Sequence, residues 1–171
     1  MMDQKIQDAF NRQLNAGIYS SYLYLSMAAY LESQGLKGMA NWMLIQAQEE
    51  NMHAMKFFDF INERGDKVAL RQIDAPKTEW TSPLDVFGDT CTHESKVTGL
   101  INNLVDLALS EKDHAANAFL QWFVTEQVEE EATAQEIRDK LKLVSDNPVA
   151  LFMIDQELGQ RVAPAPGQGQ A

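Results

Sequence analysis

The stretch QEENMH, residues 48–53, lies at the middle of a long segment, 39–64, in which apolar residues recur every three or four positions. This spacing predicts an amphipathic helix, and Glu50 and His53 fall on its apolar face. An unpaired carboxylate in a core costs several kcal/mol, so the pair must be neutralised, hydrogen-bonded or bound to a cation. Glu50 and His53 are one helical turn apart, as a metal site on one helix requires. For such a pair alone, a hydrogen-bonded core histidine is the commoner outcome.

Length and charge narrow the class of protein. A chain of 171 residues is expected to form one domain with a substantial core. The formal charge of −11, from 25 acidic and 14 basic residues, argues against nucleic acid and anionic membranes as partners and is compatible with cations. A solvated acidic surface explains this charge equally well. A single cysteine, Cys91, and the absence of a signal peptide or an apolar membrane span indicate a cytoplasmic protein.

Helices account for most of the chain. The apolar spacing predicts helices at 3–33, 39–64, 82–112, from the turn at 112–113 to 144, and, much shorter, at 149–160. Gly35 and Gly65 mark the ends of the first two, and Ser82 followed by Pro83 marks the start of the third. Four helices of this length are far above the globular mean and are typical of an all-α bundle.

Two segments lack a helical period. Residues 66–81 form a connection long enough to span roughly 55 Å when extended, so we expect it to cross the whole length of the bundle. Its apolar residues are expected to lie on the bundle surface or under a neighbouring subunit. The low-complexity segment 163–171, rich in proline, glycine and glutamine, is expected to be a flexible tail after a domain at 1–162.

Three of the predicted helices carry polar residues on their buried stripes, namely Glu50, His53, Glu94, Gln127 and Glu130. Gly17 and His53 are equally far from the first turn, at Gly35. Glu94 and Glu130 are equally far from the turn at residue 112. Both hairpins therefore place these residues about 27 Å from their turns, near the middle of the bundle. Four segments converge on one level, which favours a metal site over separate hydrogen-bonded core residues.

A second set of carboxylates lies beside the first and comprises Glu49, Glu126 and Glu129. Glu126 is three residues before Glu129, so like charges stack along one helix edge and oppose the helix by roughly 0.2 to 0.5 kcal/mol per pair. The sequence offers no basic residue that we expect at the same level of the bundle to offset these charges. Oxygen ligands with one imidazole suit Fe(II), Mn(II) or Zn(II), and two ions roughly 3.5 to 4 Å apart could bind O₂ between them. Iron in a four-helix bundle is the favoured interpretation.

The motifs Gln48-Glu49-Glu50-x-x-His53, Glu94 and Glu126-Gln127-x-Glu129-Glu130, together with Tyr24 and Trp122, resemble those of the bacterial non-haem ferritins. The resemblance covers about residues 3–160. It implies an all-α, ferritin-like up-down four-helix bundle with a long second-to-third-helix crossover and a short fifth helix. It also implies a homo-oligomeric 24-subunit cage that oxidises Fe(II) with O₂ or H₂O₂ and stores ferric oxyhydroxide inside.

The resemblance assigns roles in a dinuclear iron site. Glu50 would bridge the two irons, His53 would bind the first, and Glu94 and Glu130 would bind the second. Gln127 would orient the ligands or bound oxygen through hydrogen bonds. The resemblance therefore implies that the chain is a ferroxidase.

Further roles follow from the same resemblance. A third iron site would be formed by Glu49, Glu126, Glu129 and Glu130. Tyr24 would supply an electron, whereas Trp122 is expected to serve in packing. No haem is expected, because a haem-bearing bacterioferritin requires Glu-x-x-His on the fourth helix, where this chain has Gln127-x-x-Glu130.

One position departs from the family pattern. Gly17 stands where the family has a first-helix glutamate that binds the first iron. We therefore expect a weakened or water-filled first iron site and slower oxidation.

Two other interpretations remain open: a catalytically poor shell subunit that stores mineral, and an iron-free helical interaction protein. His93 and His114 are expected at the surface, and Cys91 is expected to be a packing residue.

Overall fold

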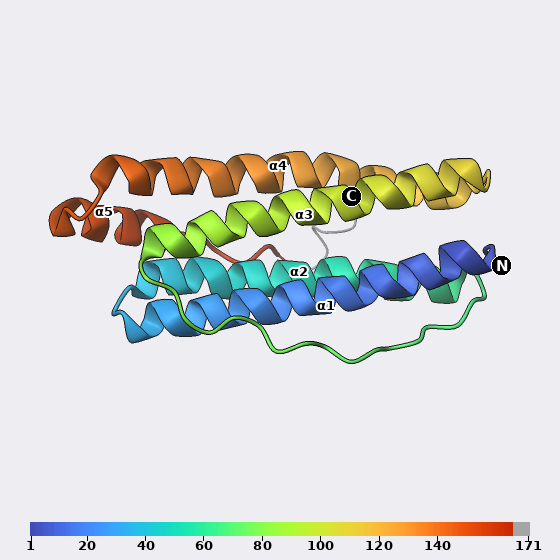
Figure 1. Cartoon of the computed structure of the whole chain (residues 1–171), viewed down its shortest axis with the longest axis horizontal. Helices are drawn as coiled ribbons and strands as arrows, with labels where there is room; N and C mark the ends of the chain where they lie inside the picture. The colour runs from blue at the N-terminus through green and yellow to red at the C-terminus, as the bar shows by residue number, and fades with distance from the viewer. Residues whose placement is uncertain (166–171) are drawn as a thin grey trace.

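The computed structural model describes residues 1–165, and this part of the chain forms a bundle of four long helices with a short fifth at one end (Figure 1). The helices are α1 (Gln4–Ser33), α2 (Lys37–Glu63), α3 (Pro83–Ser110), α4 (His114–Val144) and α5 (Pro148–Leu158). The predicted all-α class is confirmed, and the predicted helix ends agree within two residues. None of the helices within residues 1–165 combines the length and the apolar character of a membrane span. Most of the predicted flexible tail, 166–171, lies outside them.

Local signals set the helix ends. The side chain of Ser82 accepts a hydrogen bond from the Asp85 backbone N–H at 3.1 Å, and proline occupies the first position of α3. Gly35 and Gly65 end α1 and α2 in the left-handed region, with φ of +75° and +73°. The glycine and cap signals therefore predict the ends of α1 and α2 and the start of α3 correctly.

The connection between α2 and α3 runs along the whole bundle, as predicted (Figure 1). As a result, α2 and α3 point in the same direction although each pairs with an antiparallel neighbour. Asn11 of α1 anchors the connection, because its side chain donates to the Lys67 carbonyl at 3.1 Å and accepts from the Ala69 N–H at 2.7 Å. Trp80 is buried against the ring of Tyr30 at 5.5 Å.

Two apolar clusters fill the bundle, one towards each end. The α2 residues of one cluster stop at Ala47, and those of the other begin at Ala54. A layer of buried polar side chains lies between the clusters and includes Gln46, Glu50, Glu94 and Gln127. The polar residues on the predicted buried stripes therefore meet at mid-bundle, as the hairpin spacing indicates.

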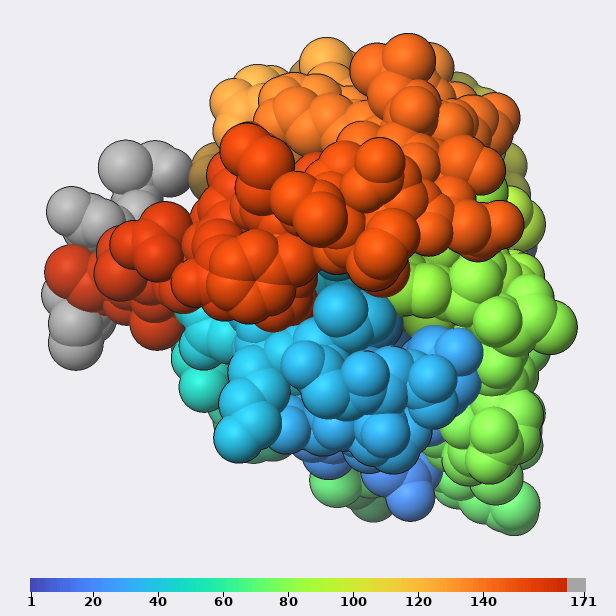
Figure 2. All heavy atoms as spheres, turned by 90° about the vertical axis from the view of Figure 1, so that its left-hand side faces the viewer, coloured from blue at the N-terminus to red at the C-terminus, as the bar shows by residue number. Residues whose placement is uncertain are grey.

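A buried carboxylate docks α5 onto the start of α2. Leu36 offers no side-chain cap to α2, but Asp155 of α5 accepts a hydrogen bond from the Met39 N–H at 2.8 Å. Gly38 and Gly159 allow the two backbones to approach closely at this point. Figure 2 looks onto this end of the molecule, where α5 lies between the end of α4 and the start of α2.

Gly38→Ala should weaken this docking strongly. A Cβ atom at residue 38 would lie 1.8 Å from the Asp155 carbonyl oxygen, so α5 would have to move away. We expect a loss of about 3 kcal/mol of unfolding free energy, measured by chemical denaturation. Gly99→Ala in α3 is the matched control, because its Cβ would meet no atom within 4 Å and alanine should favour the helix by about 1 kcal/mol. Equal stability of the Gly38→Ala and wild-type proteins would contradict the close-contact explanation.

Candidate metal centre

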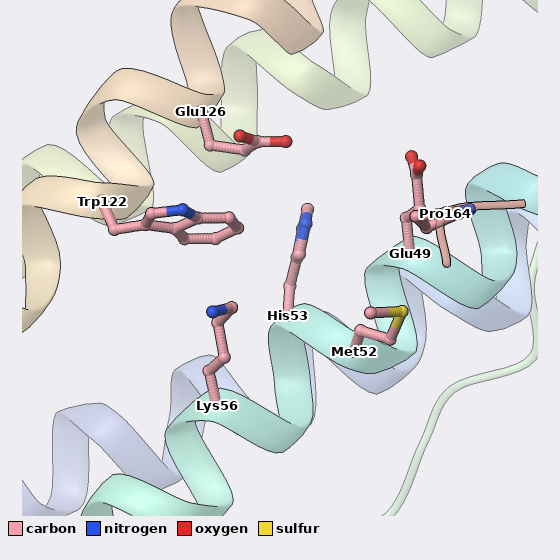
Figure 3. Close-up of a pocket in the computed structure, with 7 residues that line it drawn as sticks. All are labelled: Glu49, Met52, His53, Lys56, Trp122, Glu126 and Pro164. Atoms are coloured by element: carbon pink, nitrogen blue, oxygen red, sulfur yellow. The ribbon is translucent and has the colours of Figure 1, made fainter. Parts of the chain in front are cut away.

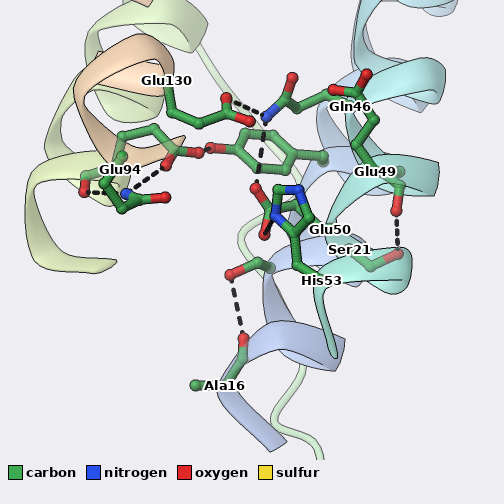
Figure 4. Close-up of polar contacts among 12 residues, drawn as sticks. Ala16, Ser21, Gln46, Glu49, Glu50, His53, Glu94 and Glu130 are labelled. Atoms are coloured by element: carbon green, nitrogen blue, oxygen red, sulfur yellow. Dashed lines mark hydrogen bonds and ion pairs between the residues drawn. The ribbon is translucent and has the colours of Figure 1, made fainter. Parts of the chain in front are cut away.

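Helices α2, α3 and α4 bring five polar side chains together at mid-bundle, and we call this group the mid-bundle centre: Glu50, His53, Glu94, Gln127 and Glu130. Glu50, His53 and Glu130 each offer one ligand atom, and these atoms all lie within 4.8 Å of one another. The His53 Nδ1 atom is 3.7 Å from a Glu50 carboxylate oxygen. Figure 4 shows Glu50, His53, Glu94 and Glu130 converging from the three helices.

Hydrogen bonds fix Glu94 from two sides. The Tyr24 hydroxyl donates to one of its carboxylate oxygens, and the Gln127 side-chain amide donates to the other at 3.1 Å. Gln127 also donates to the Thr98 hydroxyl at 3.2 Å. Burial, and next the charge of Glu94, raise the pKa of Tyr24 well above its ordinary value, so this phenol stays neutral and donates.

Gln46 lies one turn before Glu50 on α2 and joins two carboxylates of the centre. Its side-chain nitrogen donates to Glu130 at 2.8 Å and to Glu50 at 3.4 Å. The residue is only 1% exposed. The signal available in the sequence was the helical spacing, because Gln46 is four residues before Glu50 and therefore falls on the same buried face.

Burial makes the carboxylates of the centre hard to ionise. The pKa rises from 4.5 to about 8 for Glu50, to about 7 for Glu94 and to about 8 for Glu130. Burial is the largest cause in each case. For Glu94 and Glu130, the neighbouring carboxylates come next. Without metal, these carboxyl groups therefore retain protons near neutral pH. Divalent cations could displace these protons and neutralise the carboxylates in their place.

Gly17 lies beside the centre, as its distance from the turn predicts. It lines a cavity of about 20 Å³ together with Ser20, Glu50 and His53, which is room for about one water molecule. Gly17 also packs closely on α2, since a Cβ atom at this position would lie only 2.9 Å from the Ala54 Cβ atom. The spacing between α1 and α2 at this point therefore accommodates a glycine but leaves little room for a larger residue.

The second carboxylate set borders a more open cleft of about 190 Å³, which His53 also lines (Figure 3). Glu49 and Glu126 face this cleft from α2 and α4, and Pro164 of the C-terminal segment forms part of its wall. Glu129 is exposed to solvent. The structure therefore brings two of these glutamates together and leaves the third at the surface.

A cation does lie at this level, contrary to the sequence analysis. Arg161, which follows α5, places its guanidinium 2.5 Å from a Glu49 carboxylate oxygen. The two residues are 112 positions apart, and no local pattern connects them. The expectation that nothing offsets these carboxylates was therefore wrong.

The histidines outside the centre differ in their placement. The expectation for His93 was wrong, because it is only partly exposed, shares a 2.8 Å hydrogen bond with the Ser20 hydroxyl and meets the Tyr24 ring edge-on at 5.6 Å. Burial lowers the pKa of His93 to about 4, so its ring is neutral. His114 is exposed, as predicted. Trp122 packs against the His53 ring at 5.2 Å, which agrees with its expected packing role.

Comparisons with known proteins agree with this architecture. Residues 7–144 match the family model described as a ferritin-like domain. A bacterial non-heme ferritin of Bacteroides fragilis is 48% identical over 94% of this chain and 100% of its own length. One from Staphylococcus saprophyticus is 40% identical over 94% of this chain and 96% of its own length. A closed form of Archaeoglobus fulgidus ferritin, engineered by site-directed mutagenesis, is 52% identical with a TM-score of 0.95, covering 96% of this chain and 100% of its own. The open-pore ferritin of the same archaeon is 53% identical with a TM-score of 0.93, covering 94% and 98%.

Proposed function

The chain belongs to the ferritin family, and on this premise we propose that it stores iron and oxidises Fe(II) at the mid-bundle centre. The observation that carries the proposal is the buried layer of three carboxyl groups and one imidazole from separate helices. Carboxylates in such a layer are stable only when protons or cations neutralise them. Oxygen ligands with one imidazole suit Fe(II).

In this proposal, each ligand has a separate role. Glu50 would lie between the two irons, His53 would bind the first, and Glu94 and Glu130 would bind the second. Two Fe(II) ions give up one electron each, and O₂ takes up both electrons with two protons to leave as H₂O₂. H₂O₂ can instead take up the two electrons with two protons and leave as two water molecules. The Gln127 hydrogen bond supports a role in holding Glu94.

Tyr24 is proposed to assist the oxidation. Its hydroxyl donates directly to Glu94, so an electron would have only one side chain to cross between the phenol ring and the second iron. The ring is fully buried, which protects it from side reactions with solvent. Trp122 is not assigned this role, because it packs at the cleft against His53.

The cleft beside the centre is proposed as an outer iron site. Glu49 and Glu126 line it, and Glu129 and Glu130 would have to turn towards it from α4 to complete a set of four carboxylates that receives an ion on its way to or from the centre. Burial raises the pKa of Glu126 above its ordinary value. The guanidinium of Arg161 already occupies one oxygen of Glu49, so this site is weaker in cation affinity than its four carboxylates alone would make it.

We also propose that the chain assembles with copies of itself into a 24-subunit cage in the cytoplasm, with ferric oxyhydroxide stored inside. Large apolar side chains exposed on the single chain support burial by neighbouring subunits, among them Tyr22, Leu25, Leu70, Phe152 and Met153. The last two lie on α5, at the end of the bundle. No haem enters this proposal.

Gly17 favours a second candidate function. A shell subunit that contributes acidic surface for mineral growth, with little oxidation of its own, would not require a first-helix ligand. This alternative shares the fold and the storage role with the main proposal. The two differ in whether Fe(II) oxidation depends on the mid-bundle centre.

Aerobic loading with Fe(II), followed by measurement of the iron-to-protein ratio, tests the proposal. We expect hundreds of irons per assembly and an initial oxidation rate that falls by at least about ten-fold in Glu50→Ala. The matched control is Glu131→Ala, the same glutamate-to-alanine change on α4, next to Glu130 but outside the centre. If Glu50→Ala loads and oxidises at the wild-type rate, the shell-subunit alternative is correct. If wild type retains only a few irons it is an oxidase without a mineral store, and if it retains none the proposal is wrong.

A further inference from the structure

The C-terminal segment after α5 reaches back to the helix that carries Glu50 and His53. The backbone carbonyl of Arg161 accepts a hydrogen bond from the Asn41 side chain at 3.1 Å, which places the segment on α2. From there, the guanidinium donates to the Trp42 carbonyl at 3.2 Å and to the Gln46 side-chain oxygen at 3.0 Å. The same group forms the short contact with Glu49. Three successive turns of α2 therefore contact one side chain.

The guanidinium is held in one orientation. It lies over the Trp42 ring, 4.3 Å from the ring centroid, and the side chain is 21% exposed. The guanidinium stacks on the indole ring and at the same time donates to three acceptors. Both interactions require the planar geometry of arginine, which a lysine ammonium cannot reproduce. This arrangement differs from an ordinary surface ion pair, which holds neither partner firmly.

The contact with Gln46 determines which end of that amide faces the centre. A guanidinium has only donors, so Gln46 must present its oxygen to Arg161. Its nitrogen is then directed away, and it donates to Glu130 at 2.8 Å and to Glu50 at 3.4 Å. If the amide turned over while Glu50 and Glu130 are ionised, as metal binding requires, its oxygen would face two carboxylates and repel them. Arg161 thus selects the donor end of Gln46 for the centre.

We propose that Arg161 is a positioning residue of the mid-bundle centre, which acts through Gln46 to hold Glu130 and Glu50 in the arrangement that binds dications. The inference rests on the proposed function in requiring that the centre binds metal. One oxygen of Glu130 is tied to Gln46, and the other oxygen is left for a metal ion. The same arginine fixes the segment that places Pro164 at the cleft.

Two physical effects of Arg161 on metal affinity have opposite signs. Its positive charge, taken alone, repels an incoming dication, so removing the charge would tighten binding. Its positioning of Gln46 favours binding, so removing the contact would weaken it. The proposal requires that the second effect be the larger, and this makes the sign of the change decisive.

Anaerobic titration with Co(II), followed by calorimetry and by the d–d absorption spectrum, measures affinity and ligand geometry without iron oxidation. For Arg161→Met we expect about ten-fold weaker binding at the centre and an altered d–d spectrum, as is usual when a hydrogen bond to a ligand is lost. Arg161→Lys should weaken binding to a similar extent, because it keeps the charge but loses the planar fork. In a Gln46→Met background, Arg161→Met should change the affinity less than two-fold.

Arg64→Met is the matched control. Arg64 is similarly exposed, at 22%, and binds Asp113 through two hydrogen bonds of 3.0 and 2.9 Å at the far end of α2. Its loss removes an equally well-formed ion pair from the same helix. Because this pair lies away from the centre, the Co(II) affinity and spectrum should match wild type.

Each outcome bears on a separate statement. Wild-type affinity and spectrum in Arg161→Met, tighter binding in Arg161→Met, or a wild-type result for Arg161→Lys would overturn the positioning role while leaving the metal centre intact. An equal change of Co(II) affinity in Arg64→Met would show that the effect comes from a general loss of stability, and it would overturn the positioning role as well. If wild type itself bound no Co(II), the proposed function would fail together with this inference. Weaker binding in both Arg161 variants that disappears in the Gln46→Met background supports it.

Discussion

Gly17→Glu should raise the initial rate of Fe(II) oxidation by on the order of 100-fold, since loss of even one supporting residue at a metal site typically costs 10- to 100-fold. The side chain would enter the cavity that Gly17 shares with Glu50 and His53. A carboxylate there would give the first iron a third protein ligand. Stopped-flow absorbance after mixing with aerobic Fe(II) measures the change directly.

The same substitution should destabilise the metal-free protein. The new Cβ atom would lie 2.9 Å from the Ala54 Cβ atom, so α1 and α2 must move apart by a few tenths of an ångström. Overpacking of this kind costs about 1 to 3 kcal/mol. A further carboxyl group would also join a buried layer that already holds three. Bound metal should restore the lost stability, so the rise in Tm on metal addition should exceed that of wild type.

Gly17→Gln is the control for size and shape. Glutamine imposes the same crowding on Ala54 but is a poor ligand for iron. We therefore expect the same loss of stability without the gain in rate. Equal fast phases in wild type and Gly17→Glu would show that the first-helix ligand does not limit oxidation in this chain. A gain of the same size with glutamine would assign the effect to packing.

The metal-free protein should lose thermal stability as the pH rises from 6.5 to 8. The folded-state pKa of Glu50 and Glu130 is raised to about 8, and that of Glu94 to about 7, from 4.5. In this window the folded state therefore binds more protons than the unfolded state, and the free energy of unfolding falls with pH. Stability from these groups is complete below pH 4.5 and is lost as the pH passes their folded pKa values.

The pKa shift of His93 changes stability with pH in the opposite direction, and this sets the lower limit of the pH window. Its folded pKa is lowered from 6.5 to about 4, so between these values the unfolded state binds the extra proton and stability rises with pH. Above pH 6.5 the ring is neutral in both states. The decline between pH 6.5 and 8 is then due to the carboxyl groups of the centre.

We expect a decline of about 3 kcal/mol over this window, or roughly 10 °C in Tm. Scanning calorimetry of metal-free protein in matched buffers measures it. Glu130→Gln should flatten the curve, because the amide cannot ionise. Saturating Zn(II) should remove most of the slope, since the dication neutralises the carboxylates at every pH in the window. An unchanged slope in Glu130→Gln would place the titration elsewhere in the protein.

Much of the fold follows from local patterns in the chain. The heptad-like apolar spacing, the glycines after α1 and α2 and the Ser82 cap determine where the helices begin and end. The length of segment 66–81 determines that it crosses the bundle, because a shorter chain could not. Two hairpins of matched length then bring Glu50 and Glu94 to one level. Rise per residue is constant in a helix, so sequence distance converts directly into position.

The sequence by itself therefore determined the helices, their pairing and the level at which the carboxylates meet. Only the tertiary structure decided which distant residues contact one another. It placed Arg161 beside Glu49, Asp155 at the start of α2, and His93 beside Ser20 in a partly buried position. Helical periodicity reports which face of a segment is buried, but it carries no information on which distant residue covers that face. Contacts across more than 100 positions depend on how α5 docks, and that docking is set by backbone approach at Gly38.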